Sequence, residues 1–196
     1  GTSMAAPHIA GVAALLKEAD PSLTPWQAKA KMMNTADVLG SANPAPIPLQ
    51  GAGVVRADKT VTSNLIMYAD KKLVSLNFGL VEIGPEVMYE ETQTITIENV
   101  GPVPLTVFMD YEATSAAFSG ASIQFSAPSV SVPAGGSGTV DATLTLTGVD
   151  IATAFSEMEE YFGYIYALDD VVGEFASIPF YFVPRPYSVL SQAAVP

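Results

Sequence analysis

TQTITIEN, residues 92–99, alternates polar and apolar side chains, which places Ile95 and Ile97 on one side of an extended chain. A further short apolar run covers 73–78. Other strand-like runs follow downstream: PLTVFMD (104–110), SIQFS (122–126), SVSVP (129–133), TVDATLTLTG (139–148), YFGYIYAL (161–168) and FASIPFYFVP (175–184). Gly, Pro, Asn or Asp bounds each run, as is typical of short strands. About seven such strands predict an antiparallel β-sandwich of the immunoglobulin or fibronectin III type.

The first 60 residues follow a helical period instead. In MAAPHIAGVAALLKEADPSL, residues 4–23, the apolar side chains of Ile9, Val12, Leu15 and Leu16 recur at helical spacing before a proline. This pattern predicts a mostly buried helix with a polar exit. The fold class predicted from the whole chain is therefore mixed, with a helical segment before an all-β sandwich.

A second helix is predicted after a short turn. Thr24 is a suitable N-cap, Pro25 fits the first helical position, and Trp26, Ala30 and Met33 form the stripe that faces inward. The stretch GSANPAPIPLQGAGVV that follows is rich in Pro, Gly and Ala, and predicts a loop that leads into a short extended piece.

Charge divides the chain at the same place as periodicity. Residues 1–60 carry five bases and four acids, a net charge of +1, whereas residues 61–196 carry three bases and sixteen acids, a net charge of −13. We therefore expect a helical segment over 1–60, a sandwich over 61–184 and a linker or tail over 185–196. Residues 149–160 break the alternation and predict a helical turn or an irregular crossover. No basic patch is present to neutralise phosphates, which argues against a nucleic-acid partner.

Composition excludes several kinds of chemistry. The chain has 196 residues, is 49% hydrophobic and contains no cysteine, which rules out disulfides, thiolate catalysis and cysteine metal sites. No run approaches the roughly 18 uninterrupted apolar residues of a membrane span. Two acidic clusters, at 157–160 and 169–170, raise the possibility of calcium, but neither has EF-hand spacing, and a solvated acidic face is the stronger interpretation. No cofactor motif is identifiable.

The aromatic residues between 161 and 187 have two interpretations. They are able to form a platform for carbohydrate or peptide, but aromatics on strands more often fill a sandwich core or cover its edge. We therefore predict a structural role for them.

GTSMAAPHIAG, residues 1–11, raises the question of a nucleophile. A serine hydroxyl needs an adjacent base, and that base needs an orienting group. His8 is the only histidine of the chain. If the segment is helical, five residues at about 100° each place His8 roughly 140° around the helix from Ser3. His8 is therefore not expected to act as the base for Ser3.

The same eleven residues closely resemble the serine motif of subtilisin-like serine peptidases. The resemblance continues over about 60 residues, through 21–27 (PSLTPWQ), 34–36 (NTA) and 51–53 (GAG), in the family's order. It implies that the helical segment is the C-terminal part of an α/β catalytic domain, and that the substrate is a protein or peptide.

The resemblance also implies roles for single residues. Ser3 would be the catalytic nucleophile, and its own backbone N–H would help form the oxyanion hole. Gly1 and Thr2 would shape the tight approach to the helix. The other motif positions are Met4, Pro7 and His8, of which His8 would be packed and structural. In this family the triad runs Asp, His, Ser along the chain, so the aspartate and the catalytic histidine would precede residue 1.

The strand region resembles, less specifically, the fibronectin-like domain of large cell-envelope subtilases of the lactocepin type. Four segments carry this resemblance: LNFG at 76–79, TITIENVG at 94–101, GYIYAL at 163–168 and SIPFYF at 177–182. It implies an extracellular or cell-envelope location.

Two functions remain open at this stage. In the first, the chain is the C-terminal part of an exported endopeptidase and is inactive alone. In the second, it is a non-catalytic binding or spacer module of a surface protein or pseudoenzyme.

Overall fold

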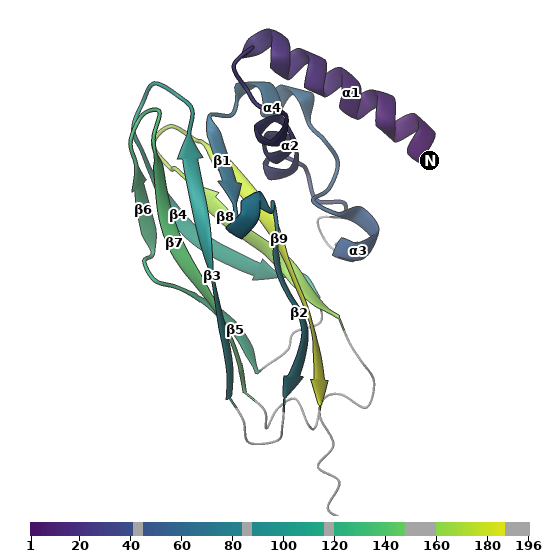
Figure 1. The fold of residues 1–196 in the computed structure, drawn as a ribbon, viewed down its shortest axis with the longest axis vertical. Coiled ribbons are helices and arrows are strands. Elements are labelled where there is room, and N and C mark those ends of the chain that lie inside the picture. Colours follow the sequence, from purple (N-terminus) through teal and green to yellow (C-terminus); the bar gives the residue numbers. More distant parts are fainter. Residues whose placement is uncertain (41–44, 84–87, 116–119, 148–159, 187–196) are drawn as a thin grey trace, which may run out of the picture.

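The computed structural model describes residues 1–40, 45–83, 88–115, 120–147 and 160–186. Within these ranges the helices gather at one end of two packed β-sheets (Figure 1). The helical elements are α1 (Thr2–Ala19), α2 (Pro25–Asn34), α3 (Ile47–Gln50), α4 (Ala57–Thr62) and a 3₁₀ turn, η1 (Asp70–Lys72). The strands are β1 (Leu65–Tyr68), β2 (Leu76–Ile83), β3 (Met88–Asn99), β4 (Leu105–Ala113), β5 (Ala121–Phe125), β6 (Ser129–Val132), β7 (Ser137–Thr147), β8 (Tyr161–Leu168) and β9 (Phe175–Pro186).

The two sheets have the strand orders β1-β3-β7-β5 and β2-β9-β8-β4-β6. All pairs are antiparallel except β2 with β9, which run parallel. In this pair the edge strand β2 lies beside β9, the last described strand of the chain. The β-sandwich expected from the alternating runs is therefore present.

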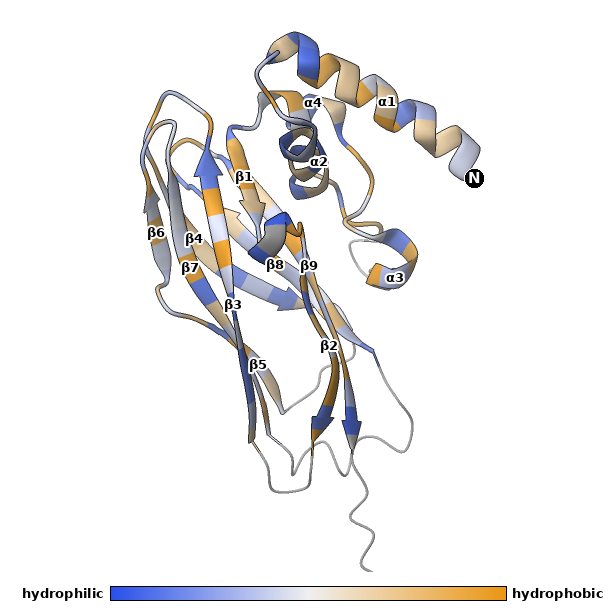
Figure 2. Cartoon of the chain, in the orientation of Figure 1, coloured by the Kyte–Doolittle hydropathy of each residue, from blue (hydrophilic) through white to orange (hydrophobic). Residues whose placement is uncertain are grey.

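The sandwich core comes from the inward side chains of both sheets. Burial alternates along β4 and β7 as the sequence pattern predicts, and Figure 2 shows the matching change of hydropathy along the strands. Ile95, Leu144, Phe180 and Phe182 are fully buried. Each such side chain contributes about 1.5–3 kcal/mol by leaving water.

The sequence predicts about seven strands from the eight runs named above, and the described residues contain nine. The strand that the pattern did not indicate is β1, in which Leu65, Ile66 and Met67 are all fully buried. These residues do not alternate because β1 contacts α2 as well as the sheets. The sequence of a strand that is covered on both faces is a continuous apolar run rather than an alternating one.

Two other sequence predictions have different outcomes. The loop expected over 40–55 contains a short helix, α3, which tolerates Pro48 because its first turn needs no N–H there. The crossover predicted for 149–160 and the tail predicted for 185–196 lie almost entirely outside the described residues. The division at residue 60 stays a prediction.

Helix α2 joins the helical segment to the sandwich. Thr24 caps it in a capping box with Gln27, as the sequence indicated for its N-terminus. The predicted inward stripe is confirmed: Ala30 is fully buried in the sandwich core, and Trp26 packs edge-on against Tyr68 with 5.1 Å between ring centroids. Helical segment and sandwich therefore share one core.

Asn34, the last residue of α2, is fully buried and bonds to one strand of each sheet. Its Nδ2 donates to the carbonyls of Met67 in β1 and Ser177 in β9, both at 3.0 Å. The N–H of Met67 donates back to Asn34 Oδ1 at 2.9 Å. The amide thus takes the place of a strand neighbour for β1 and connects both sheets to α2.

Helix α1 corrects the prediction of a mostly buried helix. Only Val12 and Leu16 are buried among its residues, while Met4, Ile9 and Leu15 are exposed. The cause is position: α1 lies on α2 and α4, away from the sheets (Figure 1). Its apolar character recurs along the whole helix, so most of that surface has no cover within the described chain (Figure 2).

Candidate functional site

Ser3 lies in the first turn of α1, which begins after the N-cap Gly1. The helix starts with the bonds from Met4 N and Ala5 N to Gly1 O, at 2.9 and 3.1 Å. The first N–H groups of a helix, that of Ser3 included, have no intrahelical acceptor. The Ser3 side chain is exposed, so hydroxyl and N–H both lie at a solvent-accessible, partly positive helix end.

Pro7 changes the backbone beside this serine. A proline has no N–H, so Pro7 cannot donate to the carbonyl of Ser3 four residues earlier. The first turn therefore lacks one of its usual helical hydrogen bonds.

His8 does not approach Ser3. Its Nδ1 donates to the carbonyl of Met4 at 2.6 Å, which ties the imidazole to its own helix. The ring is exposed rather than packed. Within the described part of the chain, no hydrogen-bond partner reaches the Ser3 hydroxyl. Of the groups that serine catalysis needs, the described residues therefore supply the hydroxyl of Ser3 and the N–H groups at the start of the helix.

Other polar groups have structural partners. Arg56 and Lys59 both form ion pairs with Asp37. The hydrogen bond from Lys59, followed by that from Arg56, lowers the pKa of the Asp37 carboxyl. These charges hold the loop after α2 to the start of α4.

The acidic pair at 169–170 is part of a turn. The buried Asp169 carboxylate accepts from the N–H groups of Val172, Thr106 and Val171, at 2.8, 2.8 and 3.0 Å. These bonds, with that from Val172 first, lower its pKa. No group of three His, Cys, Asp or Glu residues suited to a metal ion occurs among the described residues. None of the described helices is long and apolar enough to cross a membrane.

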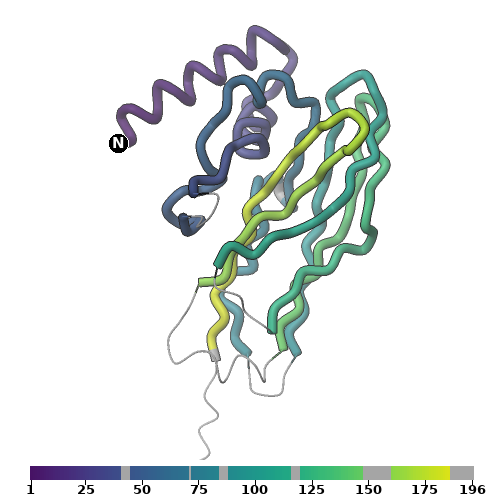
Figure 3. Tube along the Cα trace, turned by 180° about the vertical axis from the view of Figure 1, so that it is seen from behind, coloured from purple at the N-terminus to yellow at the C-terminus, as the bar shows by residue number. Residues whose placement is uncertain are grey.

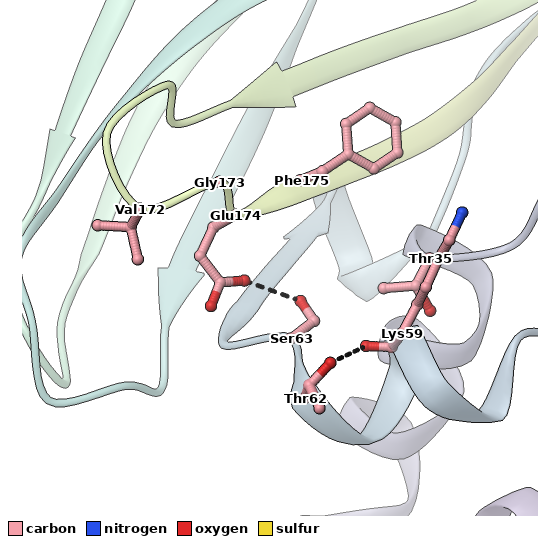
Figure 4. Close-up of a pocket in the computed structure, with 8 residues that line it drawn as sticks. All are labelled: Thr35, Lys59, Thr62, Ser63, Val172, Gly173, Glu174 and Phe175. Carbon is pink, nitrogen blue, oxygen red and sulfur yellow. Dashed lines mark hydrogen bonds between the residues drawn. The ribbon is translucent and has the colours of Figure 1, made fainter.

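A groove follows the seam between the helical segment and the β8–β9 hairpin. One cavity of about 450 Å³ is lined by residues of α4 and of the hairpin turn, among them Lys59, Glu174 and Phe175 (Figure 4). A second of about 470 Å³ also has Lys59 and Phe175 in its lining, and adds Tyr166 and Glu112. We call these two adjacent cavities the seam groove.

Glu174 lines the first cavity of the seam groove. Its carboxylate accepts from Ser63 Oγ at 3.3 Å (Figure 4). It also accepts from Asn64 N at 3.0 Å and from Asn64 Nδ2 at 2.7 Å. The hairpin that carries it lies next to the helical segment in the view from behind (Figure 3). This contact fixes the hairpin turn to the start of β1.

The aromatic residues after 161 divide between two environments. Tyr161, Phe180 and Phe182 belong to the sandwich core, as predicted. Tyr166 and Phe175 instead lie on the outer face of the second sheet and line the seam groove, which sequence reasoning missed. The alternation along the strands places these two aromatics on the outward side of the sheet. The sequence does not show that the helical segment lies beside that side and forms a groove with it.

Comparison with known proteins assigns the first part of the chain. Residues 1–64 match the model of the Subtilase family, Peptidase_S8. The "Minor extracellular protease Vpr" of Bacillus subtilis is 34% identical over 139 residues, which cover 68% of this chain and 16% of that protein. "Subtilisin BL" of Lederbergia lenta is 48% identical over 58 residues, which cover 30% of this chain and 20% of that protein. The chain thus spans a fifth or less of these relatives.

Among solved structures, the FixG-related protein from Vibrio parahaemolyticus is similar with a TM-score of 0.41 and 10% identity. The match covers 63% of this chain and 96% of that one. The match of residues 1–64 to the family model confirms the subtilase resemblance of the first 60 residues.

Proposed function

We propose that this chain is the C-terminal part of an exported subtilisin-like serine endopeptidase, in which the end of the catalytic domain continues into a fibronectin III-like sandwich. The observation that carries the proposal is the match of residues 1–64 to the subtilase family. The protease named extracellular among the relatives supports export.

In the proposed reaction Ser3 is the nucleophile. Its Oγ attacks the carbonyl carbon of the scissile peptide bond while its proton passes to a histidine base. The negative oxygen that forms accepts a hydrogen bond from the backbone N–H of Ser3, which is left without an acceptor at the start of α1. The histidine then protonates the leaving amine, and water releases the acyl group from Ser3.

The base and the carboxylate that orients it are proposed to lie upstream of Ser3. His8 is bonded to Met4 on its own helix, so it is poorly placed for the role. The uncovered apolar surface of α1 supports the same view, because a helix that is apolar around its circumference is normally buried. We therefore expect the 196-residue chain alone to hydrolyse no peptide bond.

The sandwich is proposed to brace the catalytic segment. Asn34 and the shared core hold α2 on β1 and β9, and α2 in turn carries α1. A second candidate function is a non-catalytic binding or spacer module. The seam groove favours it, because that groove is a surface separate from Ser3 that a ligand can reach.

The test is fluorophosphonate labelling of the parent protein, with mass spectrometry to locate the adduct. The 196-residue chain and a parent protein with Ser3→Ala are the controls. An adduct on Ser3 in the parent alone is the expected result. Absence of label in an intact, folded parent would overturn the proposal and favour the binding module.

A further inference from the structure

Three large apolar side chains form a row on the outer face of the second sheet. Phe108 in β4 lies opposite Leu168 in β8, which lies opposite Phe175 in β9. Their exposed fractions are 48%, 45% and 38%. We call these three side chains the apolar row. Exposed apolar side chains that gather on one face form a candidate interaction site.

The apolar row opens into the seam groove. Phe175 belongs to the row and also lines both cavities. The Tyr166 ring lies 5.8 Å from that of Phe175 and continues the apolar surface inward. The hairpin turn extends the surface in the other direction, because Val171 and Val172 are 88% and 51% exposed. Val172 and Phe175 both line the first cavity, so the turn and the apolar row border the same groove.

Negative charge borders this surface. Asp110 and Glu112 are exposed on β4, on the same outward side as Phe108. Burial, and after it the charge of Glu112, raises the pKa of Tyr166 to about 12. The nearest base, Lys59, is already paired with Asp37. Glu112 accepts from the Tyr166 hydroxyl at 3.3 Å and Asp110 accepts from Tyr111 N at 2.8 Å, but neither carboxylate has an ion-pair partner among the described residues, so both offer negative charge to a cationic partner.

We infer that the apolar row and the seam groove dock an extended segment of the protein substrate, one whose apolar side chains alternate with Lys or Arg. The inference rests on the proposed function, since it names the substrate as the occupant. Apolar side chains would cover the row and leave water. Cationic side chains would pair with Glu112 and Asp110 and lie over the ring of Tyr166.

The composition of the surface favours a protein segment over a saccharide. Sugars stack on flat aromatic faces, whereas the middle of the row is the aliphatic Leu168 and the turn beyond it exposes two valines. These branched side chains match apolar side chains of a peptide.

The binding test uses the 196-residue chain and three fluorescein-labelled peptides of equal length. In the first, Leu and Phe alternate with Lys; in the second, Glu replaces Lys; in the third, Ser replaces Leu and Phe. Fluorescence anisotropy should show that the first binds about tenfold or more tightly than either of the others, with an affinity that falls as salt rises. Equal binding of the acidic peptide, or no saturable binding of the basic one, would overturn the inference.

Variants locate the site. Phe108→Ser combined with Leu168→Ser should weaken binding of the basic peptide about tenfold. The matched control is Leu80→Ser, which is 52% exposed on β2 and pairs with Val183, far along β9 from Phe175. Glu112→Gln should flatten the salt dependence while leaving the melting temperature unchanged. If the control weakens binding as much as the double variant, the assignment is wrong.

The parent protein tests the occupant. The double variant should raise KM about tenfold for a protein substrate that carries a basic apolar segment, and leave KM for a short chromogenic peptide unchanged. If Ser3 takes no label but the peptides still bind, the proposed function fails and the surface serves another protein. If Ser3 takes label but the peptides do not bind, only the docking inference fails. Competition by a neutral oligosaccharide at the row would also overturn it.

Discussion

Replacing Asn34 with Ala tests how the helical segment is held on the sandwich. The side chain is fully buried and makes three hydrogen bonds to backbone groups of Met67 and Ser177, at 2.9–3.0 Å. Each bond contributes about 1 kcal/mol net, and a buried partner left unpaired costs about 1–3 kcal/mol. A water in the vacated polar space would restore part of this. We expect Asn34→Ala to lower the free energy of unfolding by about 4 kcal/mol.

The assay is urea unfolding of the 196-residue chain. Trp26 is the only tryptophan and packs on Tyr68 at the same seam, so its fluorescence reports on this junction. Circular dichroism in the far ultraviolet follows the strands in parallel. A loss of 4 kcal/mol would lower the melting temperature by about 8–16 °C in a chain of this size.

The control is Asn77→Ala, because the exposed side chain of Asn77 makes only a local bond, from Gly79 N to its Oδ1. A loss below about 1.5 kcal/mol for Asn34→Ala, or one matched by the control, would refute the bridging role. Asn34→Asp should be worse at neutral pH, since a carboxylate would face two carbonyl oxygens. Its cost should shrink as the pH falls and the new carboxyl takes up a proton.

Three further predictions concern single side chains. Burial lowers the pKa of Lys31 from its ordinary 10.5, so the wild-type chain should gain stability as the pH rises toward 10.5, because the unfolded chain binds more protons there. Lys31→Met should remove this slope and stabilise by about 1 kcal/mol at pH 7 in urea titrations. Asp169→Asn should destabilise by about 2 kcal/mol in the same titrations; because the pKa of Asp169 is lowered, this difference is complete above about pH 5 and shrinks below pH 4. Gly163→Ala would place a Cβ 2.1 Å from Glu112 O and should cost about 3 kcal/mol, read as a lower melting temperature.

Each of these has a contrary result. An unchanged pH slope of stability in Lys31→Met would show that other groups produce the slope. An Asp169→Asn variant as stable as the wild type would show that this carboxylate does not stabilise the hairpin turn. A stable Gly163→Ala variant would mean that β4 and β8 separate easily.

The sequence predicted features that depend on near neighbours. Alternation at Ile95 and Ile97 needs only the period of a strand, and the Thr24 cap needs only the residues that follow it. The buried strand β1 was not predicted, because the helix that covers it, α2, comes from another part of the chain. The same limit hid the apolar row, since Phe108, Leu168 and Phe175 become neighbours only through the strand order of the second sheet.

For the helix that carries the candidate nucleophile, the sequence indicated the motif but not the surroundings of the helix. The eleven-residue motif indicated Ser3 directly, and the role of this serine stays a prediction. The burial of α1 was predicted from its apolar pattern and proved wrong for this chain. An apolar pattern indicates that a helix is suited to burial, but it does not show which residues pack against that helix.

The bond from Asn34 to Ser177 has a consequence for the order of events during synthesis. The two residues are 143 positions apart, and β9, which carries Ser177, is the last described strand and the partner of both β8 and β2. At about 5–20 residues per second, a ribosome needs roughly 7–30 s to make the intervening chain. Throughout that interval α2 and β1 have left the ribosome without the strand that locks them. We therefore expect α2 and β1 to gain this bond only after β9 has emerged from the ribosome.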